Sequence, residues 1–211
     1  MSSVQEFHDE LMSDVAAEAS SATGGEHVGD VFRENAFSQI VSADLEAAGV
    51  LESPTVCYYA NTQGRLPYKV NAYSIPDEEQ RLDIVIADFR SETTVQKLTA
   101  SDVDRTFRQA LRFFDVAIAR EAVAVDPGHE EHAMLSDIFV KRDRFSRVQL
   151  ILITNAILVQ RREKERRDEH DGYQVGYEIW DIERLRRFRS SGSTHEPVEV
   201  DLGGLQDGGI R

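Results

Sequence analysis

Three positions in the first half of the chain could support metal-dependent chemistry. Glu34 lies at helical spacing from the apolar residues Phe37 and Val41, so its carboxylate is predicted to face a neighbouring sheet rather than water. Asn71 lies in one strand-like run, and Asp88 lies near the end of the next. A nuclease whose elements follow the order helix, three strands, helix and strand would hold magnesium with acids from its first helix and its second and third strands. Glu34 could equally be a first-turn acid that compensates the helix dipole.

The set of catalytic groups is nevertheless incomplete. An amide, Asn71, stands where the second strand would need an acid, and Asp88-Phe89-Arg90 stands where acid-x-Lys would be needed. Arginine can clamp a phosphate but stays protonated, so it is a poor base. Asp83 alternates with Asp88 onto the opposite face of a regular strand and cannot complete the same site. These residues predict a vestigial site.

Other catalytic and metal-binding patterns are missing from the sequence. There is no phosphate-binding glycine loop and no Gly-x-Ser-x-Gly turn. Cys57 is the single cysteine, which excludes an internal disulfide. Among the six histidines only His129 and His132 are close in sequence, and nothing points to a third ligand. We therefore expect no metal site.

A basic segment near the end of the chain could contact nucleic acid. Arg184 and Arg187, with Arg189, fall near one side of a helix predicted to begin after Asp181. These arginines could pair with the acidic N-terminal segment, or could form a weak phosphate-binding strip together with Arg161-Arg162. The mixed-charge run 160–171 is expected to be a solvated loop or helix end.

Periodicity and turn residues give the elements that would position these side chains. The expected helices are 3–19, 30–48 (capped by Asp30 and ended by Gly49), 101–118 (with a Ser101–Asp104 capping box), 129–141 and 182–188. The expected strands are 55–60, 68–75, 81–89, 148–154, 174–180 and an edge strand at 197–202. Short connections predict that the first three strands form an antiparallel meander.

The order of these elements predicts an α+β fold with a mixed central sheet flanked by helices. Helix, three strands, helix and strand is also the order of the restriction-endonuclease-like αβββαβ core. In this arrangement Phe107, Leu111 and Phe114 should pack on a sheet surface built from Val85, Ile86, Leu150 and Leu152.

Composition excludes some classes of protein. The 211 residues carry a net charge of −14, and residues 1–60 hold eleven acids and one base. This charge argues against a large non-specific nucleic-acid surface. No apolar run approaches the ~18 residues of a membrane span, and the acidic start lacks the features of a signal peptide. We expect a cytoplasmic protein with no membrane contact.

Several short motifs, in order, resemble the abortive-infection phage-resistance (AIPR) proteins. They are 32–37 (FRENAF), 45–49 (LEAAG), 56–59 (VCYY), 70–73 (VNAY), 82–89 (LDIVIADF) and 179–185 (IWDIERL). The helical spacing and the Ser/Gly run near the start predict an N-terminal helix and linker at 1–24. The resemblance implies a nuclease-like N-terminal domain at 28–202 and a linker or truncated end at 203–211. It also implies a role in antiviral defence. Nuclease-competent relatives carry Asp-Gly-Tyr at Asn71-Ala72-Tyr73 and Gln-x-Lys at Ala87-Asp88-Phe89, and both departures remove catalytic groups.

Three functional hypotheses remain open at this level. The first is a catalytically inactive nuclease-like sensor, scaffold or oligomerisation module, which would need no cofactor and would bind a protein partner or itself. The second is a metal-dependent nuclease of the PD-(D/E)xK type, using Mg²⁺, Glu34, Asp88 and a displaced Lys or Arg. The third is a protein-interaction domain with no nuclease ancestry. Weak or no binding of duplex DNA is expected.

Overall fold

The computed structural model describes residues 3–23, 29–61, 66–76, 80–119, 130–159 and 167–191. Arg161, Arg162, the proposed edge strand at 197–202 and the segment 203–211 lie outside the described residues. The helices are α1 (Val4–Thr23), α2 (Asp30–Ala47), α3 (Ala100–Ile118), α4 (Glu130–Lys141) and α5 (Ile182–Ser191), with a 3₁₀ turn at Arg142–Arg144.

A mixed sheet of six strands forms the centre of the fold, in the order β1-β2-β3-β5-β8-β7. Its strands are β1 (Thr55–Asn61), β2 (Tyr68–Ser74), β3 (Arg81–Asp88), β5 (Arg147–Thr154), β7 (Arg167–His170) and β8 (Tyr173–Trp180). The expected antiparallel meander β1-β2-β3 is confirmed, and β3, β5 and β8 run parallel. Two short strands, β4 (Lys97–Leu98) and β6 (Ile157–Leu158), pair beside it.

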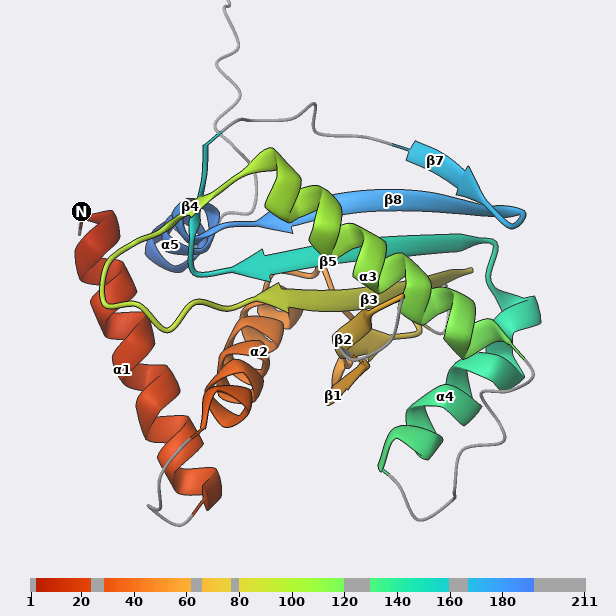
Figure 1. Cartoon of the computed structure of the whole chain (residues 1–211), viewed down its shortest axis with the longest axis horizontal. Coiled ribbons are helices and arrows are strands. Elements are labelled where there is room, and N and C mark those ends of the chain that lie inside the picture. The colour runs from red at the N-terminus through yellow and green to blue at the C-terminus, as the bar shows by residue number, and fades with distance from the viewer. Residues whose placement is uncertain are drawn as a thin grey trace, which may run out of the picture.

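Helices cover both faces of the sheet, which confirms the α+β class (Figure 1). Helix α3 crosses one face over the middle strands, and α4 lies beside it. Helix α2 lies on the opposite face, and α1 packs against α2 and α5. The order α2-β1-β2-β3-α3-β5 is the expected order of elements. Kinship with restriction-endonuclease-like proteins stays a prediction.

The core under α3 follows the apolar periodicity of that helix. Phe107 and Phe114 are buried, and Leu111 is partly buried, against a sheet surface that includes Ile86, Leu150 and Leu152. Val85, predicted to be part of this surface, belongs to the other core. Neighbouring strand residues point to opposite faces, so Val85 and Ile86 cannot both lie under α3.

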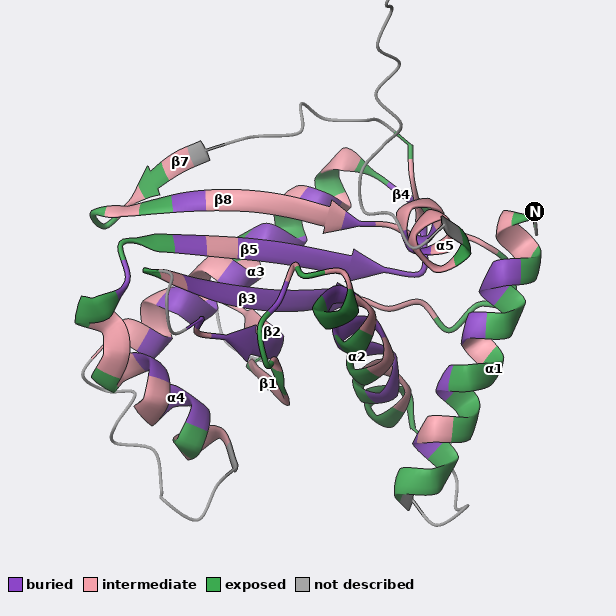
Figure 2. Cartoon of the chain, turned by 180° about the vertical axis from the view of Figure 1, so that it is seen from behind, coloured by how far each residue is buried: buried purple, intermediate pink, exposed green. Residues whose placement is uncertain are grey.

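The second core lies between the sheet and the helices α1, α2 and α5. Its largest buried side chains are Phe37 and Trp180, and α1 contributes Leu11 with no exposed surface. Strands β3 and β5 are buried along most of their length because helices cover both of their faces (Figure 2). The acidic first helix is therefore part of the packed structure.

Local details of the helix ends differ from the expectations in three places. The N-cap of α2 is Gly29 rather than Asp30, and the capping box of α3 joins Thr99 to Asp102 rather than Ser101 to Asp104. Each cap lies one or two residues before its predicted position, because residues that can cap a helix stand close together in both segments. Helix α1 also continues through the serines to Thr23.

Other helix-end signals are confirmed. Gly49, at φ 69°, follows the end of α2 in the left-handed conformation that glycine favours. The Asp181 carboxylate accepts a hydrogen bond of 3.0 Å from the backbone N–H of Arg184, as expected for the N-cap of α5.

Part of the mixed-charge run 160–171, which was expected to be a solvated loop or helix end, instead forms strand β7. Within the described residues, no helix has the length and apolarity needed to cross a bilayer.

Candidate functional site

The first candidate residue, Glu34, faces the sheet from α2. The buried stripe of α2 includes Phe37, Val41 and Leu45, and Glu34 continues it by one turn toward the helix start. Its side chain is only 17% exposed and reaches the central part of strand β2. The carboxylate therefore makes tertiary contacts in addition to lying near the helix N-terminus, where the dipole favours it.

Lys69 on β2 is the main partner of Glu34. Its Nζ lies 2.8 Å from Glu34 Oε1 and donates a second hydrogen bond of 2.7 Å to the backbone carbonyl of Ala87 on β3. The lysine side chain is 16% exposed. One ammonium group thus binds a carboxylate oxygen and a carbonyl oxygen, both of which are atoms that a magnesium ion would accept as ligands.

Asn71 joins the same group from the next inward position of β2. Its Nδ2 donates to Glu34 Oε1 at 2.7 Å, and its Oδ1 accepts from the backbone N–H of Ala87 at 2.8 Å. The side chain is fully buried. Because an amide both donates and accepts, it satisfies both neighbours, whereas an ionised aspartate could only accept.

Ala87 shows why these side chains matter to the sheet. The register between β2 and β3 extends only from Ala72↔Val85 to Ser74↔Asp83. Beyond it, the side chains of Asn71 and Lys69 bind the N–H and the carbonyl of Ala87. Since buried backbone groups need partners, the two side chains continue the link between the strands where the backbone ladder stops.

Tyr58 on β1 lies near the same carboxylate. Burial, and then the negative charge of Glu34, raise the pKa of its phenol. Near pH 7 the Tyr58 phenol therefore stays protonated and can act only as an uncharged hydrogen-bonding group. We call Glu34, Tyr58, Lys69 and Asn71 the Glu34 cluster.

The third predicted site residue, Asp88, does not join the Glu34 cluster. Its carboxylate pairs with Arg90 at 2.7 Å, and lies 3.9 Å from Arg105 on α3. Asp88 therefore faces the α3 side of the sheet, while Glu34 approaches from α2. Asp83 is fully buried and pairs with the partly buried Arg81. It shares the α2 face with Val85 and Ala87, as strand alternation requires.

The residues after Asp88 also have structural partners. Phe89, where nuclease-competent relatives are expected to carry the lysine of Gln-x-Lys, packs its ring against Phe37 with centroids 5.3 Å apart. Arg90 is held by Asp88 and by Asp102 at 3.4 Å, and its backbone N–H and carbonyl bind the amide of Asn155. The contacts of Phe89 and Arg90 therefore do not form a catalytic centre together with Glu34.

The two predicted nucleic-acid contacts on α5 are engaged within the chain. Arg184 pairs with Glu178, and its guanidinium stacks over Trp180 at 3.9 Å. Arg187 donates to the backbone carbonyl of Glu183. The expected pairing with the acidic N-terminal part is made by Arg189, which lies 2.8 Å from Asp44 and 3.7 Å from Asp14.

The sequence interpretation missed Lys69 and Tyr58. A usable signal existed for Lys69, because residues two apart in a strand share a face and Lys69 precedes Asn71 by two. It also missed a second group, Asp115, His170 and Asp171, whose ligand atoms lie within 4.8 Å of one another. Asp115 is 55 positions from His170, so no local pattern could have joined them.

Comparison with known protein families identifies the chain. Residues 37–187 match the model of the abortive infection phage resistance protein N-terminal domain. The chain belongs to this family. The match confirms the resemblance seen in the sequence motifs and covers most of the chain. No curated protein and no solved structure matches the chain significantly.

Membership in the abortive infection phage resistance family assigns the chain to proteins of phage defence. The matched region contains Lys69, Asn71 and Asp88, and begins three residues after Glu34. Lys69 and Asn71 therefore belong to the family domain, and they meet Glu34 just outside the match. The family description names no chemical activity, so the chemistry of the Glu34 cluster must be argued from its geometry.

Proposed function

We propose that this chain is a catalytically inactive nuclease-like module that acts in phage defence through protein contacts, as a sensor, scaffold or oligomerisation unit. The order of elements supports the nuclease-like part of the proposal, and the family membership supports the role in phage defence. The observation that carries the proposal is the position of Lys69, whose ammonium binds the oxygen atoms of Glu34 and Ala87.

The chemical reason is the shortage of negative ligands. A magnesium-dependent nuclease holds its ions with several carboxylates, whereas the Glu34 cluster contains a single carboxylate, that of Glu34. The positive charge that balances it belongs to Lys69 rather than to an ion. Asn71 brings no charge, and Asp88 is neutralised by arginines on the other side of the sheet.

One observation favours a second candidate, a metal-dependent nuclease with a displaced lysine. Lys69 shares a face of β2 with Asn71 and contacts Glu34, so a lysine does lie next to the predicted acidic position. In that case Lys69 would act on the attacked phosphate, and binding of Mg²⁺ would have to break its pair with Glu34.

A cleavage assay separates the two candidates. The whole chain would be incubated with plasmid, linear and single-stranded DNA and with Mg²⁺ or Mn²⁺, beside the variants Lys69→Met and Glu34→Gln. We expect no cleavage by any of them. Metal-dependent cleavage that both variants abolish and the exposed-site control Asp143→Asn retains would establish the second candidate.

The interaction role has its own measurement. Mass measured by light scattering over a wide range of protein concentrations reports self-association directly. A mass that rises from monomer to a defined oligomer supports an oligomerisation module. A constant monomer mass restricts the proposal to a heterologous protein partner.

A further inference from the structure

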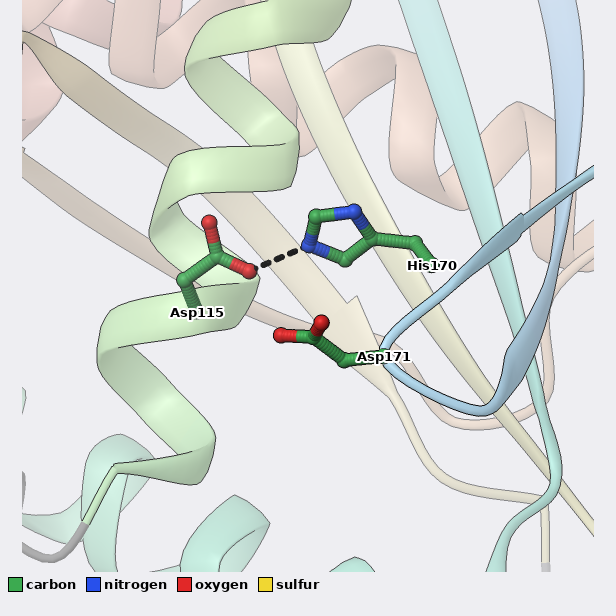
Figure 3. A group of neighbouring side chains, drawn as sticks. All are labelled: Asp115, His170 and Asp171. Atoms are coloured by element: carbon green, nitrogen blue, oxygen red, sulfur yellow. Dashed lines mark hydrogen bonds and ion pairs between the residues drawn. The ribbon is translucent and has the colours of Figure 1, made fainter.

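Three side chains of metal-binding type meet on the α3 side of the fold, away from the Glu34 cluster. They are Asp115 on α3, His170 at the end of β7, and Asp171 in the turn that follows (Figure 3). His170 Nε2 lies 2.6 Å from Asp115 Oδ1, and one ligand atom from each residue lies within 4.8 Å of the others. Figure 3 shows the His170 imidazole and the Asp171 carboxylate directed from the hairpin toward α3, which carries Asp115.

The backbone holds these ligands in place without help from an ion. Asp171 and Gly172 form the two-residue turn between β7 and β8, with φ values of 48° and 85° and the pair His170↔Tyr173 closing it. These angles are those of a type I′ hairpin, in which Asp-Gly is favoured. The left-handed backbone of Asp171 thus belongs to the turn, and it places His170 and Asp171 side by side.

The hairpin is also fixed against α3 by aromatic packing next to Asp115. The ring of Phe114 packs edge-on against Tyr173 with centroids 5.0 Å apart, and lies 6.4 Å from the His170 ring. Phe114 is fully buried. Because the adjoining core fixes both the helix and the hairpin, the three ligands come from rigid elements, which lowers the entropic cost of binding an ion.

The ligand set identifies the class of ion. An imidazole nitrogen among the ligands favours Zn²⁺ and related transition-metal ions, whereas Mg²⁺ and Ca²⁺ prefer oxygen ligands alone. Bonds of about 2.0–2.2 Å to zinc require the ligand atoms to approach more closely than 4.8 Å. Asp115 and Asp171 retain enough solvent exposure for their side chains to make this small adjustment.

We propose that Asp115, His170 and Asp171 form a binding site for a transition-metal dication, with Zn²⁺ the best fit, that joins the β7–β8 hairpin to α3. The three residues leave a fourth tetrahedral position for water or a partner's ligand. The site lies on the opposite side of the sheet from the Glu34 cluster, so it is independent of the function proposed above.

The test uses the whole chain without an affinity tag. Zn²⁺ binding is measured by calorimetry, and Co²⁺ is added as a spectroscopic substitute whose visible bands report its coordination. We expect one equivalent of Zn²⁺ to bind with micromolar or tighter affinity. Saturation should raise the melting temperature by about 5 °C or more at concentrations 100-fold above Kd.

The variants assign the ligands. Asp171→Asn removes the charge while asparagine tolerates the left-handed backbone, so this variant keeps the hairpin turn. We expect it, Asp115→Asn and His170→Gln each to weaken Zn²⁺ binding at least tenfold, and His170→Gln to change the Co²⁺ bands. The matched control, Asp143→Asn, removes an exposed acid outside the group and should bind like the unmodified chain.

Two results would overturn the proposal. One is the absence of any stoichiometric heat or Co²⁺ band with the unmodified chain. The other is equal Zn²⁺ affinity in Asp171→Asn, the control and the unmodified chain, which would locate the ion elsewhere. If His170→Gln fails to fold, Asp171→Asn still decides between the outcomes.

Discussion

Lys69 and Glu34 form an ion pair of 2.8 Å between β2 and α2, with both side chains more than four-fifths shielded from solvent. Removing one partner from a pair this well shielded from water costs more stability than removing one partner from a surface pair. It joins α2 to β2, the second strand of the six-stranded sheet.

Lys69→Met should lower the free energy of unfolding by about 1–3 kcal/mol, because Glu34 would keep its charge in a shielded position with only Asn71 as a partner. Urea unfolding measures the loss. Lys141→Met makes the same substitution in the i,i+4 pair with Asp137 on α4, where both side chains are 33% exposed, and should cost no more than about 0.5 kcal/mol. Equal losses in both variants would contradict a structural role for the pair.

Asn71→Asp should destabilise the chain most at high pH. The introduced aspartate, once ionised, would place a second carboxylate where Asn71 Nδ2 now lies 2.7 Å from Glu34. Neighbouring like charges raise a carboxyl pKa, so the folded form favours the protonated acid and loses stability as pH rises through that pKa. Urea unfolding at pH 5 and pH 8 should show a larger loss at pH 8. Asn35→Asp, an exposed change in the first part of α2, is the control and should show no such loss.

Phe114→Ala should cost about 3–5 kcal/mol, because Phe114 is fully buried among α3, the sheet and Tyr173. Val140→Ala removes apolar atoms from a side chain that is 71% exposed, and should change stability by about 0.5 kcal/mol or less. The urea midpoint measures both. An unchanged midpoint for Phe114→Ala would show that α3 does not dock on the sheet as described.

The capping box of α3 gives a pH-dependent prediction. Hydrogen bonds from the Thr99 side chain and backbone, together with the charges of Arg105 and Arg90, lower the pKa of the Asp102 carboxyl. Its contribution is therefore complete above the unfolded pKa of about 3.9 and is lost as pH falls through the lower folded value. Asp102→Asn should cost about 0.5–1 kcal/mol at pH 7 and progressively less in acid. A difference that stays constant down to pH 2 would contradict this origin.

Duplex DNA should not bind measurably near 0.15 M salt, where surface charges are screened beyond about 8 Å. Arg184 is occupied by Glu178 and Trp180, and the neighbouring Arg189 by Asp44. Any weak binding at low salt should fall steeply as salt rises. Fluorescence anisotropy with a labelled duplex measures it. Micromolar affinity at 0.15 M salt that Arg184→Glu with Arg187→Glu abolishes would contradict the prediction.

Much of the architecture follows from local sequence patterns. The apolar repeats of α2 and α3 predict the helices and the face that each buries, and the inward direction of Glu34 follows from the same repeat. Strand alternation predicts that Asp83 and Asp88 face opposite sides. These features are local consequences of a period of 3.6 or 2 residues, so the chain itself specifies them.

The contacts within each site depend on tertiary structure. The pairing of Lys69 with Glu34 requires α2 to lie over β2, and the bonds to Ala87 exist because the ladder between β2 and β3 ends at Val85. His170 meets Asp115 only because the hairpin packs on α3. Residues 35 to 55 positions apart can meet in many ways in an unfolded chain. Only the packing of helices on the sheet selects one of them, since burial of the two apolar cores fixes where those helices lie.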